Sequence, residues 1–279
     1  MKKSTWLKLC LPVFICCSLW NLTLPHAYGT DKADDKTDKD KREIVKRARQ
    51  GYYSLRKLGL VEFESKITPT WEVTLKEQIK SDPASAQTGL KLLNSIHFAM
   101  SLDADGSVKV THQLDVTPPN QQTVDGLNQI YGGMQQSVSG FFASWSPFML
   151  TSPFPEVESE YAFEEIGGGY RLSYKEGTAD IVTSLTKDLE VTEIKVSTSE
   201  FTSSIKPTLT KTQQGFILSG YEANYKPVSG PGTTELKTQI DYQEVNGLQL
   251  PHKLNLESVY DGTPTQMELV FTDYNVKHK

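Results

Sequence analysis

The chain has 279 residues, and its 29 Lys and Arg against 34 Asp and Glu give a net charge of −5. This length is sufficient for a domain with a sizeable hydrophobic core. The acidic balance, with no basic stripe to neutralise phosphates, argues against a nucleic-acid partner and against binding to an anionic membrane surface.

The N-terminus has the pattern of an export signal. A basic start precedes a largely apolar stretch over 7–24, and Ala27 and Gly29 are small residues at the positions that signal peptidase reads. We therefore predict a signal peptide over 1–29, cleaved after Gly29, and a periplasmic or secreted protein. The alternative is an uncleaved membrane anchor, because the apolar stretch approaches the length of a short spanning helix.

The three cysteines, Cys10, Cys16 and Cys17, all lie in this segment. The mature chain would then contain no disulfide, although an exported protein meets an oxidising compartment. Zinc–thiolate sites and cysteine nucleophiles are excluded there for the same reason. Cleavage also leaves 26 basic against 34 acidic residues, a net charge of −8.

Two segments of different character follow the signal. Residues 30–41, TDKADDKTDKDK, alternate in charge and lack apolar residues that could be buried, which predicts a disordered tether. From residue 42 the apolar residues recur at helical spacing, which predicts an amphipathic helix that ends at Gly59. The residues of that apolar face are Ile44, Ala48, Tyr52 and Leu55.

The next segments alternate between strand and helix patterns. The sequence LVEFESKIT predicts a half-buried strand, because polar residues separate those of one face. We expect that buried face to consist of Val61, Phe63, Ser65 and Ile67. Two short helices are predicted over 71–79 and 83–93. A hairpin that turns at Asp105-Gly106 follows them.

Segment 120–150 has the most regular pattern in the chain. Its apolar residues are spaced alternately three and four apart, which predicts a helix with a wide apolar face. They are Val124, Leu127, Tyr131, Met134, Val138, Phe141, Trp145 and Phe148, with Ile130, Phe142 and Met149 beside them. Four glycines weaken this helix, so packing must stabilise it. We expect Pro147 to end it, since the residue before a proline avoids helical geometry.

From residue 160 onward, short alternating strands are separated by frequent turn signals. Gly167-Gly168-Gly169, Asn246-Gly247 and Asp261-Gly262 are hairpin signals. The pattern predicts an antiparallel meander, one face of which needs a cover that segment 120–150 can supply. The predicted fold class is α+β and mostly antiparallel β, either a half-open β-barrel or a strongly curved sheet covered by a helical lid. We expect a single domain over 42–279.

The closing sequence VNGLQLPHKL, followed by ELVFTDYNV, and the order of the elements resemble the periplasmic outer-membrane lipoprotein carriers and lipoprotein-sorting-like proteins of bacteria. The direct resemblance covers about a sixth of the chain. It implies a Lol-type fold, a half-open barrel lidded by helices, several members of which hold acyl chains in the cavity. The acyl-handling arginine that the family carries on an early strand has no assignable counterpart here.

Catalytic signatures are missing from the sequence. The four histidines outside the signal are scattered, and no metalloprotease helix, nucleophile elbow or phosphate-binding glycine loop occurs. Neighbouring carboxylates such as Glu164 and Glu165 point to opposite faces of a strand and cannot share one proton transfer. The sequence therefore predicts a monomeric protein that is not an enzyme and that has no cofactor and no metal.

The sequence leaves three functions open. The first is an envelope carrier or binding protein for a lipid-like or acylated ligand, held between the sheet and the helical lid. The candidate ligand-binding residues are Met134, Phe141, Phe142, Trp145, Phe148 and Met149. The second is a non-catalytic envelope interaction or assembly module, with a protein partner, in which the same residues form a solid core. The third is a hydrolase whose site is not recognised.

Overall fold

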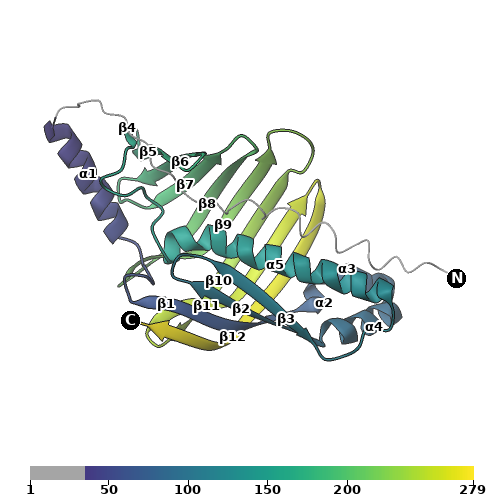
Figure 1. The fold of residues 1–279 in the computed structure, drawn as a ribbon. Coiled ribbons are helices and arrows are strands. Elements are labelled where there is room, and N and C mark those ends of the chain that lie inside the picture. The colour runs from purple at the N-terminus through teal and green to yellow at the C-terminus, as the bar shows by residue number, and fades with distance from the viewer. Residues whose placement is uncertain (1–34) are drawn as a thin grey trace. The chain divides into compact units, whose positions relative to one another are not determined.

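A computed structural model describes residues 35–279 of the chain. It is an α+β protein with twelve strands in one mostly antiparallel sheet (Figure 1). The strand order has two ends, β3 (Val108–Leu114) and β4 (Ala162–Ile166), so the sheet is not closed into a barrel. The predicted fold class is confirmed in these features. The predicted signal peptide and its cleavage site lie outside the described residues.

The described residues group into two compact units. The first contains 55–144 and 236–279, and its strand order is β3-β2-β1-β12-β11-β10. Helices α2, α3 and α4 lie side by side at one end of it (Figure 1). Its elements besides β3 are β1 (Leu60–Pro69), α2 (Trp71–Thr74), α3 (Lys76–Ser81), α4 (Pro83–Leu93), β2 (Ile96–Asp103), α5 (Gln121–Met149) up to residue 144, β10 (Thr234–Val245) from residue 236, β11 (Leu248–Tyr260) and β12 (Thr263–His278).

The second unit contains 35–54 and 145–235, with the strand order β9-β8-β7-β6-β5-β4. Each neighbouring pair from β4 to β9 is an antiparallel hairpin. Besides β4, its elements are α1 (Asp35–Gln50), β5 (Gly169–Glu176), β6 (Ala179–Thr186), β7 (Val191–Ser197), β8 (Phe201–Thr212) and β9 (Gly215–Pro227).

The predicted hairpin turns are present. Asn246 and Gly247 have φ values of 52° and 81° between β10 and β11, and Asp261 and Gly262 have 45° and 80° between β11 and β12. Successive positive φ values are what a two-residue hairpin turn requires, and Gly supplies the second without a steric cost. The turn at Gly106, with φ of 94°, also joins β2 and β3 as predicted.

Strand β1 differs from its predicted pattern at its start. Phe63, Ser65 and Ile67 are buried on one face as expected, but Val61 is exposed and Leu60 is buried. The pairing of β1 with β12 shifts register between Leu60 and Glu62. Because a bulge breaks the alternation of side chains, Val61 falls on the outer face.

Helix α1 also differs from its predicted bounds. It begins at Asp35, so residues 35–41, which we assigned to a disordered tether, are helical from that residue on. Val45 and Ala48 are buried and anchor the helix, and each further residue then adds one backbone hydrogen bond. The helix ends at Gln50 rather than at Gly59. Tyr52 instead forms a bridge to Phe216 of β9, a long-range pairing that helical periodicity does not reveal.

Helix α5 agrees closely with the predicted helix over 120–150. Pro147 lies inside its last turn instead of ending it, and the helix continues to Met149. A proline this near the end removes one backbone hydrogen bond only. The carbonyl of Ser146 accepts from the N–H groups of Leu150 and Thr151, both at 2.9 Å, which closes the helix. No helix within residues 35–279 has the length and apolar character needed to span a membrane.

Candidate functional site

The six candidate ligand-binding residues all lie on α5, and each is at most 2% exposed. The apolar face of the helix is therefore fully covered at these positions. Three of the residues belong to the first unit and three to the second. In the first unit they are Met134, Phe141 and Phe142, and in the second they are Trp145, Phe148 and Met149.

In the first unit, α5 packs on β1 and β12 through aromatic rings. The Phe142 ring lies 6.0 Å from that of Phe63 and 6.1 Å from that of Phe271, measured between centroids. Phe141 lies 4.8 Å from Phe142 in an edge-to-face arrangement and 6.4 Å from Phe271. These separations are typical of favourable aromatic packing. We call these four rings the ring cluster.

Buried hydroxyl groups lie among the apolar residues of the first unit. Thr238, on the buried face of β10, is 2% exposed, and its Oγ1 has no hydrogen-bond partner among the described residues. Ser65 is buried beside Tyr274, and the Tyr274 hydroxyl donates to the carbonyl of Pro251. Burial raises the pKa of Tyr274, so this hydroxyl stays neutral. Thr74 and Thr183 share this feature with Thr238, and each such hydroxyl can bond to a ligand or to water.

A second feature, which sequence reasoning missed, is a cleft of about 480 Å³ in the second unit. The end of α1, the β6–β7 turn and the β8–β9 hairpin form its walls. Five charged residues line it, and we call it the charged cleft. They are Arg47, Lys187, Asp188, Glu190 and Lys211, with Leu189, Leu209 and Phe216 as the apolar lining.

Tyr52 fixes the β6–β7 turn at this cleft. Its hydroxyl donates to the carbonyl of Leu189 at 3.3 Å and accepts from the N–H of Val191 at 2.8 Å. Leu189 has a φ of 67°, in the left-handed region that branched residues rarely adopt. Burial raises the pKa of Tyr52, which therefore remains a neutral hydroxyl that can both donate and accept. A strained residue that its surroundings hold in place is a recurring mark of functional sites.

Gly215 fixes the opposite wall. It has a φ of 114°, and a Cβ at this position would lie 2.7 Å from the carbonyl oxygen of Gly51. The next residue, Phe216, donates to that same oxygen at 2.8 Å and accepts from the N–H of Tyr53 at 3.1 Å. Only glycine permits this approach of two backbones, and the approach places Phe216 beside α1.

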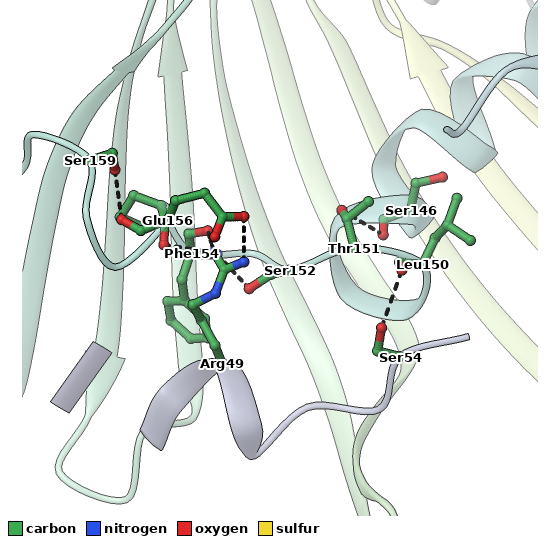
Figure 2. Close-up of polar contacts among 10 residues, drawn as sticks. Arg49, Ser54, Ser146, Leu150, Thr151, Ser152, Phe154, Glu156 and Ser159 are labelled. Carbon is green, nitrogen blue, oxygen red and sulfur yellow. Dashed lines mark hydrogen bonds and ion pairs between the residues drawn. The ribbon is translucent and has the colours of Figure 1, made fainter. Parts of the chain in front are cut away.

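Arg49, on α1, holds the chain that follows α5 (Figure 2). Its guanidinium donates to the carbonyls of Phe154 and Pro155 at 2.8 and 2.7 Å and to the Glu156 carboxylate at 2.5 Å. The Phe154 ring also packs edge-to-face on Tyr52 at 5.2 Å. The planar fork of arginine suits this set of neighbouring acceptors, so the segment after α5 is tied to the helix that lines the charged cleft.

The histidines do not assemble a site. His97 contacts Asp115 at 2.5 Å on the surface, and the ring of His112 stacks on Tyr131 at 3.5 Å between centroids. Within residues 35–279, no group of three or more His, Cys, Asp and Glu side chains is arranged to hold a metal ion.

Comparisons with family models, with curated proteins and with solved structures find no match to this chain.

Proposed function

We propose that this protein is an exported, non-catalytic carrier or binding protein for a lipid-like or acylated ligand, held in the first unit between α5 and the strands. The proposal rests on one observation: an apolar layer of aromatic rings and Met134 shares its unit with the unpaired hydroxyl of Thr238. Ligand sites combine a mostly apolar lining with a few polar groups that fix orientation. An acyl chain would replace ring contacts, and its carboxyl or ester oxygen would accept from Thr238.

The composition of α5 supports this function. Gly126, Gly132, Gly133 and Gly140 each cost about 1 kcal/mol of helix propensity relative to alanine. The helix α5 would therefore have little stability in isolation, and it depends on packing against the surface beneath it. A ligand that offers the same apolar contact can take the place of part of that surface at a modest cost, and the helix then closes over it.

The first test is mass spectrometry of an organic-solvent extract of the purified full-length protein. We expect co-purifying fatty acid or lipid. The second test measures binding of a fluorescent fatty acid to Thr238→Val and to Thr183→Val. Thr183 is the matched control, because it is fully buried beside Tyr174 in the second unit. We expect Thr238→Val to weaken binding of the fluorescent fatty acid and Thr183→Val to leave this binding unchanged.

Thr238→Val should leave stability unchanged or raise it, since the hydroxyl that it removes has no partner to lose. The loss of binding is then not a folding defect. A clean extract together with no probe binding by the parent protein would overturn the proposal.

The alternative is an envelope interaction or assembly module with a solid core. The observation in its favour is the tight packing of the ring cluster, in which Phe142 is fully buried with neighbouring rings at 4.8 to 6.1 Å. The same experiments separate the two functions, because a solid core predicts no co-purifying lipid and equal probe behaviour of both threonine variants.

A further inference from the structure

The charged cleft contains cations and carboxylates that do not pair with one another. Lys187 is bound to Glu165 and lies 4.4 Å above the Tyr170 ring, so its charge is already compensated. Arg47, Lys211 and Asp188 have no ion-pair partner among the side chains that the structure describes. Opposite charges that line one cleft and leave each other unpaired are available to a ligand that carries both signs.

From this arrangement we infer that the charged cleft binds a small phosphorylated amine, a molecule with one phosphate and one ammonium group. The phosphate lies against Arg47 and Lys211, since a phosphate near neutral pH carries between one and two negative charges and the arginine fork matches its oxygens. The ammonium lies against Asp188 and Glu190. This inference is independent of acyl binding in the first unit, because it rests on other residues.

The apolar residues of the cleft fit the same ligand. Phe216 and Leu209 stand beside the charged groups and can cover the carbon atoms between phosphate and ammonium. Lys211 already lies 5.9 Å from the centre of the Phe216 ring, an arrangement in which the ring attracts its charge and holds it in the cleft. The cleft volume of about 480 Å³ lies within the usual range for small-molecule sites.

The cleft is also prepared before a ligand arrives. Tyr52 holds the turn that carries Asp188 and Glu190, and the close backbone approach at Gly215 holds the hairpin that carries Lys211 and Phe216. Binding then costs little ordering of the backbone, and such preorganisation raises affinity for a small ligand.

The test is isothermal titration calorimetry of the full-length protein with three probes: phosphoethanolamine, inorganic phosphate and ethanolamine. We expect phosphoethanolamine to bind at least about tenfold more tightly than either single-charge probe, since only it engages both sets of side chains. Arg47→Gln and Asp188→Asn should each weaken phosphoethanolamine binding about tenfold or more. Lys226→Gln, an exposed lysine of β9 that does not line the cleft, is the matched control and should bind as the parent does.

Three outcomes would overturn the inference. One is equal affinity for phosphate and phosphoethanolamine, which would mean a site for anions only. The second is unchanged binding in Arg47→Gln and Asp188→Asn, and the third is no binding of any probe. Vesicles of phosphatidylethanolamine identify the source of the ligand. If the vesicles compete with phosphoethanolamine for the cleft, the ligand is a lipid headgroup. If they do not compete, the ligand is a free small molecule. The competition is read only after phosphoethanolamine itself has bound.

Discussion

Replacing Gly215 with alanine tests whether the close approach of two backbones organises the second unit. The φ of 114° at Gly215 is unfavourable for any L-residue with a side chain, and the new Cβ would lie 2.7 Å from the Gly51 oxygen and 2.9 Å from backbone atoms of Tyr52 and Tyr53. Backbone atoms cannot rotate away as a flexible side chain can. Segment 51–53 must therefore shift.

The expected cost has two parts. The positive φ costs about 1–2 kcal/mol for a residue with a Cβ. The shift of 51–53 also weakens two hydrogen bonds, Phe216 N–H to Gly51 O at 2.8 Å and Tyr53 N–H to Phe216 O at 3.1 Å, each contributing about 0.5–1.5 kcal/mol. We expect Gly215→Ala to lower the free energy of unfolding by about 2–5 kcal/mol.

Gly230→Ala is the matched control in the same unit. Gly230 has a φ of 85°, but a Cβ there would meet no atom within 4 Å, so only the backbone term of about 1–2 kcal/mol applies. Urea unfolding of both variants, followed by circular dichroism and tryptophan fluorescence, measures the difference. If the two variants lose equal stability, the contact between 51–53 and β9 does not organise this unit and the reasoning fails.

Three further predictions concern other positions. Gly132→Ala should stabilise the protein by about 1 kcal/mol in urea unfolding, because a Cβ there meets no atom within 4 Å and the helix gains propensity; a loss of stability would show that the glycine is needed. Tyr52→Phe should cost about 1–3 kcal/mol by the same assay, since it leaves the Leu189 carbonyl and the Val191 N–H without their partner. A cost near zero would mean that the β6–β7 turn keeps its conformation without the Tyr52 hydroxyl. Arg49→Ala should cost about 2–3 kcal/mol and speed proteolysis after Phe154, whereas an Arg49→Lys variant as stable as the parent would rule out a need for the guanidinium fork.

The elements that the sequence predicted well are those set by local chemistry. Asn246-Gly247 and Asp261-Gly262 predict hairpins because their positive φ values depend on the two residues themselves. Helix α4 occupies the predicted range 83–93, with Pro83 in its first turn and Asp82 accepting from the Ser85 N–H at its start. In each of these elements, the residues that give the sequence pattern lie within a few positions of those that form the structure.

The parts that the sequence did not predict depend on residues far apart in the chain. Tyr52 fits the apolar face of a helix that continues to Gly59, yet its pairing with Phe216 ends that helix early. The charged cleft joins α1 to two turns more than a hundred residues away. Its charged side chains look like ordinary surface residues in sequence, and no spacing rule relates them. The positive φ of Gly215 marks the close backbone approach in the structure, but the glycine alone does not show in the sequence which residues it lies against.

The apolar face of α5 shows the limit of periodicity as evidence for function. The spacing of three and four identified most of the buried positions, because burial follows from one face of a helix, although Val124 and Tyr131 of the same series are only half-buried. It says nothing of whether a protein ring or an acyl chain lies opposite, since both present the same apolar surface. Thr238 contributes little to the pattern, but its buried hydroxyl has no partner among the described residues, and it is the residue at which the two functions give different predictions. For a face such as this one, substitution of a buried polar residue in the same unit tests the function more directly than substitution of the aromatic residues.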